Sequence, residues 1–303
     1  MITIFATPRK FQGHFGLIQR NAIGSWIRLH PRPQVLLMGN DDGIVEACAE
    51  LGVIHVPDIK CNEFGTPLIN SMITQAEKLA ENDLMLFITF DTILFNDIIA
   101  AAKIVSRKFN RFCIVGQRQH IDLREPIDFS NPNWESWVRR AALPPTVYDV
   151  NAGDYFLYPK GFWRMFPPFA MGRSVHDNWM FYRTLALEGA LVDATLAVTT
   201  IHQEHDYSHH PQGYKGVCQG IEAQHNRELA GSGIEHCSIL DANYILTQTG
   251  VKKGWPSIRK MKLKIKNTTY DWLVYRTGPF RHKIGLRRAN IPLLKQWLTH
   301  LIK

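Results

Sequence analysis

One carboxylate, Asp91, stands at the point where an apolar segment ends. Residues 84–93 read LMLFITFDTI, and a continuous apolar run of this kind is typical of a buried parallel strand. Ligands of open α/β sheets gather at the carboxyl ends of such strands, so Asp91 is a candidate ligand of a metal ion or a substrate. An Asp in this position can also be only the N-terminal cap of the next helix, and Asp91 alone fits both interpretations.

A second group of potential ligands follows another apolar segment, residues 191–201. The sequence IHQEHDYSHH at residues 201–210 holds four His and two acidic residues. Neutral imidazole and carboxylate ligands together suit Mn²⁺, Mg²⁺ or Zn²⁺. His202 and His205 are therefore candidate ligands of a divalent cation together with Asp91, and the alternative is a solvated polar loop. A structural zinc site is less favoured, because no cysteine accompanies the histidines.

A third candidate is Asp177, in the sequence GRSVHDNW at residues 172–179. It follows a Gly-Arg turn and precedes an apolar helix expected from Trp179 to Leu187. A carboxylate in this position caps the helix, and it can also accept a proton from a substrate hydroxyl. Asp177 is therefore interpreted as a helix cap, a general base, or both.

The elements that must position these residues alternate between strand and helix. Strands are predicted at residues 1–6, 34–38, 53–56 and 84–93, and helices at residues 13–29, 44–51, 68–79 and 97–105. Four such alternations predict a largely parallel sheet with right-handed crossovers. Further strands are expected at residues 112–116 and 191–201, whereas the aromatic stretch 151–182 shows no regular pattern.

Composition limits the class of protein. The chain has 303 residues, of which 45% are apolar, enough to bury a globular core. It has no uninterrupted apolar stretch of about 18 residues, and its first eight residues lack the regions of a signal peptide, so we expect a cytoplasmic protein. Five scattered cysteines without a Cys-x-x-Cys pair predict reduced thiols rather than a disulfide framework.

The net charge of +8 is concentrated near the C-terminus. Residues 252–303 contain 14 Lys and Arg and one acid, Asp271, which leaves 21 Lys and Arg and 26 acids in residues 1–251. The end of the chain, IPLLKQWLTHLIK at residues 291–303, predicts a cationic amphipathic helix, and such helices bind anionic membrane surfaces. We therefore expect a peripheral location at the inner face of a membrane, with an ordinary solvated helix as the alternative. Nucleic-acid binding is disfavoured, because the main body is acidic and carries no recognition motif.

The order of these segments resembles that of nucleotide-sugar-dependent glycosyltransferases with the GT-A fold, especially the large family 2 type. The turn Asn40-Asp41-Asp42-Gly43 after the second strand is similar to the Asp-Asp-Gly-Ser-like turn of that family. Residues 65–80 and 84–94 are similar to its Gly-rich loop, helix and strand ending in Asp-x-Asp. Asp91 matches the second Asp of that motif, but Thr89 stands in place of the first.

The resemblance extends over about residues 1–210, and its implications are specific. It implies an α/β fold with a mostly parallel, Rossmann-like central sheet flanked by helices, in a domain at residues 1–245. The charge and amphipathic pattern add a basic helical extension at residues 246–303. It implies transfer of a hexosyl sugar from a nucleotide-sugar donor to a hydroxyl of a glycan or lipid-linked acceptor, as in polysaccharide biosynthesis.

The resemblance also implies roles for single residues. The nucleotide sugar would contact Thr7, Pro8, Arg9, Asp41, Asp42, Thr66 and Asp91. A divalent cation, Mn²⁺ or Mg²⁺, would be held by Asp91, His202 and His205. Asp177 would match the late acidic residue that serves as general base in inverting members of the family.

Two other functions remain compatible with the same residues. A metal-dependent hydrolase would use Asp91, His202 and His205 to activate water, although no metallohydrolase motif is present. A catalytically inactive GT-A-like protein, kept as a binding or scaffolding subunit, is favoured by Thr89 at the first position of Asp-x-Asp. Each alternative predicts a different dependence on nucleotide sugars and on Asp177.

Overall fold

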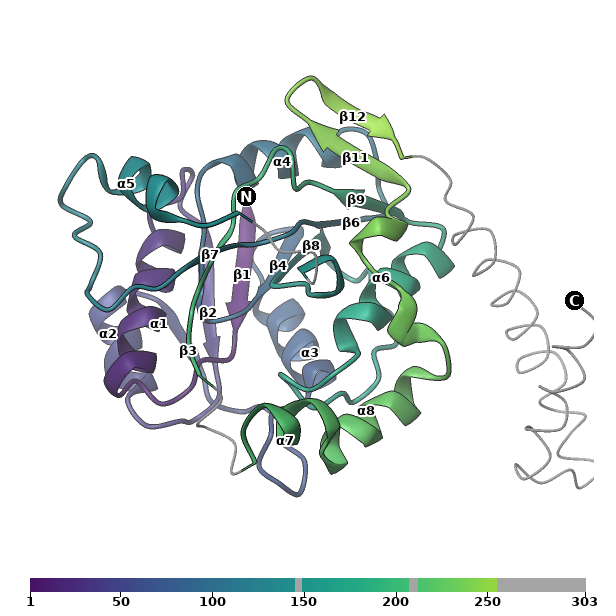
Figure 1. The fold of residues 1–303 in the computed structure, drawn as a ribbon, viewed down its shortest axis with the longest axis horizontal. Coiled ribbons are helices and arrows are strands. Elements are labelled where there is room, and N and C mark those ends of the chain that lie inside the picture. Colours follow the sequence, from purple (N-terminus) through teal and green to yellow (C-terminus); the bar gives the residue numbers. More distant parts are fainter. Residues whose placement is uncertain (145–148, 207–211, 255–303) are drawn as a thin grey trace, which may run out of the picture. The chain divides into compact units, whose positions relative to one another are not determined.

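The computed structural model describes residues 1–144, 149–206 and 212–254 (Figure 1). In this part of the chain a nine-stranded sheet has the order β12-β11-β9-β6-β8-β4-β1-β2-β3, and helices flank it. Its strands are β1 (Ile2–Ala6), β2 (Gln34–Met38), β3 (Ile54–Val56), β4 (Leu84–Ile88), β6 (Phe112–Val115), β8 (Tyr155–Pro159), β9 (Ala190–Asp193), β11 (Tyr244–Thr247) and β12 (Gly250–Lys253). The predicted α/β fold is confirmed.

The sheet is mostly parallel, as predicted. β1 pairs in parallel with β2 and β4, and β2 pairs in parallel with β3. β9 likewise pairs in parallel with β6 and β11. Every residue of β1 is buried, which suits an interior strand covered on both faces. The antiparallel exceptions are β8, which lies between β4 and β6, and β12, which pairs with β11. β8 falls within the aromatic stretch that showed no regular pattern in the sequence.

The helices of the first half connect the parallel strands. They are α1 (Gly13–Trp26), α2 (Ile44–Leu51), α3 (Ile69–Leu79) and α4 (Asp97–Ser106). The buried face of α1 joins the main core through fully buried side chains such as Ile23 and Trp26. The Trp26 indole N–H donates a hydrogen bond to the Thr92 carbonyl at 2.8 Å, and the Ser25 hydroxyl accepts one from the Leu94 amide at 3.0 Å. These bonds hold the segment around Asp91 against α1.

The predicted strand at residues 84–93 is two strands. β4 ends at Ile88, and β5 (Thr92–Ile93) belongs to a second sheet of order β5-β10-β7, with β7 at Gln119–Ile121 and β10 at Ile201–Gln203. Both pieces are buried, so the apolar pattern is continuous although the chain turns between them. Asp91 therefore lies in the turn between two strands, three residues after β4.

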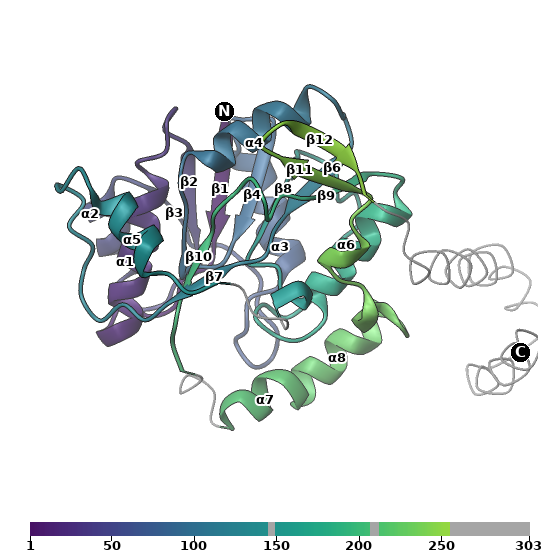
Figure 2. The ribbon, with the colours of Figure 1, turned by 45° about the horizontal axis from the view of Figure 1, so that its top comes forward.

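The predicted strand at residues 191–201 is also divided, into β9 and β10. Asp193 ends β9, because its Oδ1 accepts hydrogen bonds from the amide and the hydroxyl of Thr195, at 3.0 and 2.6 Å. Such local bonds compete with strand pairing. Figure 2 shows β10 running beside β7, with which it pairs in parallel. The strand that carries His202 is thus in the small sheet.

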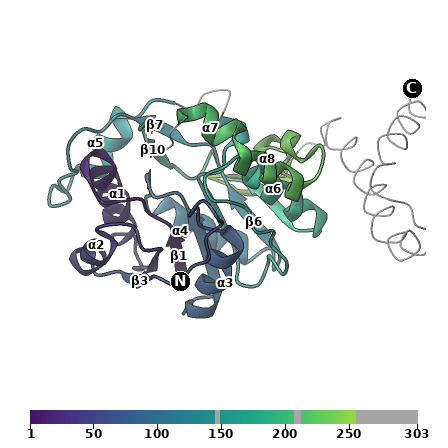
Figure 3. The ribbon, with the colours of Figure 1, turned by 90° about the horizontal axis from the view of Figure 1, so that it is seen from below.

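The remaining helices are α5 (Trp134–Ala141), α6 (His176–Ala186), α7 (Gly213–Gln219) and α8 (Ile221–Ala230). Figure 3 shows α6 and α8 on one side of the strands and α1 and α2 on the opposite side. The sheet continues through Lys253, past the predicted boundary at residue 245. The rest of the predicted basic extension, 255–303, and residues 207–211 of the histidine-rich segment lie outside the described residues. Within the described ranges, no helix has the length and apolarity needed to cross a membrane.

Candidate active site at the carboxyl ends of the strands

The predicted site residues gather where β1, β2 and β4 end. These strands are neighbours and parallel, so their carboxyl ends meet at one edge of the sheet. The segment Thr7–Lys10 follows β1, the turn Gly39–Asp42 follows β2, and Asp91 follows β4. This edge is where ligands bind in open α/β sheets.

Asp91 contacts both predicted histidine ligands. Its Oδ2 lies 2.8 Å from His205 Nε2, and its Oδ1 lies 3.5 Å from His202 Nδ1. The Thr89 hydroxyl donates a hydrogen bond to Oδ1 at 2.7 Å. One ligand atom from each of Asp91, His202 and His205 can be chosen so that all lie within 4.8 Å of one another. The structure thus brings together the three residues predicted to bind a cation.

Two charged residues that the sequence analysis missed complete this cluster. Asp154, directly before β8, is 6% exposed, and its Oδ2 lies 3.3 Å from His202 Nδ1. Its Oδ1 pairs with the Arg118 guanidinium at 2.6 Å. The only signal in the sequence is a carboxylate next to an aromatic strand, YFLYP at residues 155–159, and unlike Asp91 it precedes its strand.

Burial and pairing set the charges of the cluster. Burial opposes ionisation of Asp91, but the His202 and His205 imidazoles outweigh it and hold the pKa of Asp91 well below its usual range. Burial also lowers the pKa of His202, yet Asp91 and Asp154 raise it to about 10. Despite its burial, Asp154 has a lowered pKa because Arg118 and His202 stabilise its carboxylate. The cluster therefore contains two carboxylates that share one imidazole.

These residues fit a divalent cation. Carboxylate oxygens and imidazole nitrogens are ligands of Mn²⁺, Mg²⁺ and Zn²⁺. Over the described residues, Asp154 Oδ2 and His202 Nδ1 are buried atoms without a hydrogen bond of good geometry. Buried polar atoms are normally satisfied, so this pair leaves capacity for an additional charged group.

A buried glutamine fixes the backbone on both sides of the cluster. Gln203 is fully buried, and its side-chain amide donates hydrogen bonds to the carbonyls of Asp91 at 3.0 Å and Ile18 at 2.8 Å. Its Oε1 accepts a hydrogen bond from Asn21 at 3.0 Å. Because Gln203 lies between His202 and His205 in the sequence, it ties the histidine segment to the Asp91 turn and to α1.

Arg9 places a cation beside this cluster. Its guanidinium lies 5.8 Å from the Phe15 ring centre and 5.5 Å from that of Phe90, the two rings that also contact His205. Burial, followed by repulsion from Arg173, lowers the pKa of Arg9 to about 10. No carboxylate of the described residues lies within ion-pair distance of this guanidinium, and its Nε is buried without a hydrogen bond.

The backbone of the Arg9 segment is rigidly held. The fully buried Gln19 of α1 accepts a hydrogen bond from the Arg9 amide and donates to the Arg9 carbonyl at 3.1 Å. The Thr7 hydroxyl donates to the Met38 carbonyl at 2.9 Å, which joins the ends of β1 and β2. Pro8 lies between these anchored residues. The predicted nucleotide-contacting segment is therefore fixed by hydrogen bonds to α1 and β2.

The acidic turn after β2 lies at the border of the site. Asp42 is exposed and forms a 3.2 Å ion pair with the equally exposed Lys10. Asp41 is also exposed, and partial desolvation of its carboxyl group by neighbouring atoms raises its pKa, although Arg9 and Lys10 oppose this change. Both carboxylates are thus near the cations that follow β1.

Thr66 belongs to a neighbouring buried ion-pair cluster. Arg173 and Glu222 are 9% and 8% exposed and lie 2.7 Å apart. Arg173 also donates to the Thr66 hydroxyl at 3.3 Å, and Asn62 donates to Glu222 at 2.7 Å. Because the charge of Arg173 lowers the pKa of Arg9, this cluster borders the cation side of the site.

Asp177 lies in the first turn of α6 and is not its N-terminal cap. Val175 is at the cap position with φ of 74°, and α6 begins at His176. Asp177 Oδ1 lies 2.7 Å from His176 Nε2, and its Oδ2 accepts a hydrogen bond from the Gly153 amide at 3.3 Å. Since Gly153 directly precedes Asp154, the structure brings Asp177 next to the charged cluster. Its side chain is 23% exposed, so solvent can reach it.

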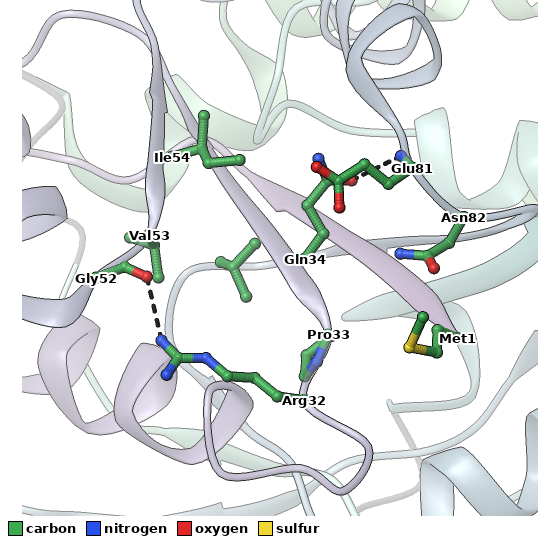
Figure 4. A pocket seen from close by; sticks show the side chains of 10 residues that line it. Met1, Arg32, Pro33, Gln34, Gly52, Val53, Ile54, Glu81 and Asn82 are labelled. Atoms are coloured by element: carbon green, nitrogen blue, oxygen red, sulfur yellow. Dashed lines mark hydrogen bonds between the residues drawn. The ribbon is translucent and has the colours of Figure 1, made fainter.

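A concave region at the opposite end of the strands is separate from these residues. It encloses about 340 Å³ and is lined by side chains near the amino ends of β1 and β2, among them Met1, Arg32 and Gln34 (Figure 4). Its polar groups bond to one another: Arg32 donates to the Gly52 carbonyl at 3.1 Å, and Gln34 accepts from the Glu81 amide at 3.0 Å. It offers no group of potential metal ligands.

Comparison with known proteins finds similarity only among solved structures. No protein-family model and no curated protein matches the chain. The chain is similar to S. aureus TarS 1-349, with a TM-score of 0.39 and 12% identity over 67% of this chain and 58% of that chain. The complex of TarS 1-349 with UDP-GlcNAc gives a TM-score of 0.43 and 12% identity over 67% of this chain and 59% of that chain. GalNAc-T7 with UDP, GalNAc and Mn²⁺ gives a TM-score of 0.46 and 14% identity over 68% of this chain and 44% of that one. The chain thus spans less than two thirds of the length of each of these proteins.

Proposed function

We propose that the protein is a glycosyltransferase that uses a nucleotide-sugar donor and a divalent cation. One observation carries the proposal: the unpaired Arg9 guanidinium lies beside the Asp91, His202 and His205 cluster at the carboxyl end of the sheet. The diphosphate of a nucleotide sugar carries negative charge that needs both a cation and further positive groups. Arg9 and the cation site together meet that requirement.

Different residues of the chain would bind the phosphates, the rest of the nucleotide sugar and the cation. Arg9 would bind phosphate oxygens and recover the electrostatic stabilisation that it lacks in the free protein. Thr7, Pro8, Asp41, Asp42 and Thr66 would border the nucleotide sugar. A divalent cation held by Asp91, His202 and His205 would supply positive charge to the departing diphosphate.

Asp177 would accept the proton of the acceptor hydroxyl. The His176 imidazole and the Gly153 amide hold its carboxylate in one orientation, and its partial exposure permits contact with an acceptor. A positioned base contributes about 10²–10⁴-fold to a rate. Direct attack by that hydroxyl on the sugar inverts the configuration at the anomeric carbon. We propose a glycan or lipid-linked acceptor.

The hydrolase alternative is less well supported by the site. A water-activating cluster needs Asp91 and the histidines but has no use for a partly buried guanidinium without a carboxylate partner. The charge of Arg9 in this environment opposes folding. An anionic ligand that binds the folded protein would offset this cost, which gives Arg9 a role in a nucleotide-sugar site. The transferase therefore accounts for more of the site than the hydrolase does.

The proposal is tested by binding and turnover in two variants. Nucleoside diphosphate sugars, screened with and without Mn²⁺, should raise the melting temperature of the wild type, by roughly 5–10 °C at a ligand concentration of 100 Kd. Asp91→Ala should lose this increase. Asp177→Asn should keep it but lose transfer to the acceptor, and Glu228→Gln, 79% exposed on α8, is the matched control.

These measurements distinguish the transferase from the hydrolase and test the role of Asp177 separately. If no nucleotide sugar stabilises the wild type, the transferase proposal is wrong. If Asp177→Asn transfers sugar at the wild-type rate, its role as the base is wrong although the donor site stands. Metal-dependent hydrolysis without any nucleotide would support the hydrolase.

A further inference from the structure

Asp154 lies directly opposite Thr89 in the sheet. β4 and β8 are antiparallel, with Ile88 paired to Tyr155, so the next pair is Thr89 and Asp154. The Thr89 amide donates a hydrogen bond to the Asp154 carbonyl at 2.8 Å. Directly opposed residues of antiparallel strands place their side chains on one face, with Cβ atoms about 4.5–5.5 Å apart. The Asp154 carboxylate is therefore on the face to which the side chain of residue 89 points.

Residue 89 is the position at which this chain lacks a carboxylate. Thr89 donates its hydroxyl to Asp91 Oδ1, so it supports the remaining acid without adding negative charge. A divalent cation held by a single carboxylate is incompletely neutralised, since the imidazole ligands are uncharged when they bind a metal. A second carboxylate within the same cluster would correct this deficit.

The contacts of Asp154 suit that role. Its two oxygens face different partners: Oδ1 pairs with Arg118 at 2.6 Å, and Oδ2 lies 3.3 Å from His202 Nδ1. The same imidazole nitrogen lies 3.5 Å from Asp91 Oδ1. His202 is thus held between two buried carboxylates, one from the turn after β4 and one from the start of β8.

We propose that Asp154 is the second carboxylate of the cation site, beside His202 Nδ1, in place of the carboxylate that residue 89 lacks. This inference rests on the cation site of the proposed function. Asp154 Oδ2 and Asp91 Oδ1 approach the same ring nitrogen, His202 Nδ1, so both carboxylates face one nitrogen of a proposed cation ligand. Arg118 holds Asp154 from the other side and keeps it in place. Asp154 is therefore placed to supply the second negative charge of the site.

The test is direct Mn²⁺ binding to the full chain, measured by the electron paramagnetic resonance signal of free Mn²⁺. Asp154→Asn should bind Mn²⁺ about 10–100-fold more weakly than the wild type. Asp97→Asn is the matched control, because Asp97 also pairs with an arginine, Arg139 at 2.9 Å, but has no contact with His202. Its Mn²⁺ affinity should stay within about twofold of the wild type.

A charge-relocation variant separates this role from a purely structural one. In Thr89→Asp/Asp154→Asn the carboxylate moves to the opposite strand on the same face, and Mn²⁺ affinity should recover at least about tenfold relative to Asp154→Asn. If Asp154 only pairs with Arg118, Asp154→Asn should leave Mn²⁺ affinity unchanged, and there is no loss for an Asp at residue 89 to rescue. Wild-type affinity in Asp154→Asn, or no rescue in the double variant, would overturn the inference.

Two further outcomes are absent Mn²⁺ binding by the wild type and failure of Asp154→Asn to fold. If the wild type binds no Mn²⁺ with or without UDP, the cation site of the proposed function is wrong, which is a distinct result. If thermal melting shows that Asp154→Asn does not fold, Asp154→Glu keeps the charge for Arg118 but displaces the oxygens by one methylene. Weaker Mn²⁺ binding by Asp154→Glu supports the inference, and unchanged binding contradicts it.

Discussion

Replacing Arg9 with Met should stabilise the protein without ligand and abolish its stabilisation by a nucleoside diphosphate. Burial and the charge of Arg173 lower the pKa of Arg9 from 12.5 to about 10. That change corresponds to about 3 kcal/mol against the charged form. Because the guanidinium is charged at pH 7 in both the folded and the unfolded chain, this free energy opposes folding at neutral pH.

Removing the Arg9 charge should therefore stabilise the fold, but part of this stabilisation is lost because Arg9→Met also removes cation–π contacts. The guanidinium lies over Phe15 and Phe90, and each cation–π contact contributes roughly 0.5–1 kcal/mol. Met retains apolar contact with the rings, so the net gain in the free energy of unfolding should be about 1–2 kcal/mol. For a domain of this size, that gain corresponds to a melting temperature about 2–8 °C higher.

The measurement is thermal and urea unfolding with and without UDP and Mn²⁺. Lys10→Met is the matched control, because it removes one positive charge at the neighbouring position, where Lys10 and Asp42 are 64% and 65% exposed. Its stability should change by less than about 0.5 kcal/mol. The reasoning is refuted if Arg9→Met is less stable than the wild type without ligand, or if UDP stabilises it as strongly as the wild type.

Two further predictions concern residues that support the site. Burial lowers the pKa of His176, but Asp177 and the Arg173 carbonyl outweigh it and raise that pKa above 6.5. The contacts of protonated His176 with Asp177 and the Arg173 carbonyl therefore stabilise the fold fully below about pH 6.5, and this stabilisation is lost as pH rises through the folded-state pKa. In urea unfolding, His176→Asn should lower the free energy of unfolding more at about pH 6 than at about pH 9. Gln203→Leu should cost about 2–4 kcal/mol, because it removes three buried side-chain hydrogen bonds, two donated to the Asp91 and Ile18 carbonyls and one accepted from Asn21. A loss below about 1 kcal/mol, or an equal loss in the exposed control Gln224→Leu, would contradict that account.

Local patterns were sufficient for the first half of the fold. The predicted and observed bounds agree for β2 at residues 34–38 and for α2 at residues 44–51. Both elements have strong local signals: a short apolar run for β2, and for α2 an apolar face bordered by Gly43 and Gly52, whose φ angles are 84° and 61°. Such signals lie within a few residues of the element itself, so they can be read without knowledge of the fold.

The sequence also predicted three of the residues that lie together in the candidate site. Asp91, His202 and His205 were recognised because each follows an apolar strand, and the structure places them in contact. The pattern did not reveal that residues 84–93 and 191–201 are each divided into two strands. Burial makes both segments apolar throughout, so hydrophobicity cannot show where the chain turns.

Only the tertiary structure identified the partners of these residues. Asp154 joins the cluster because β8 pairs antiparallel with β4, although 63 residues separate it from Asp91 along the chain, and Arg118 reaches it from the end of another strand. The sequence by itself determined the strand and helix order and the residue types able to bind a cation, since both depend on local patterns of burial. The tertiary structure decided which charges meet and how Arg9 is desolvated, because long-range strand pairing and burial depend on residues distant in the chain.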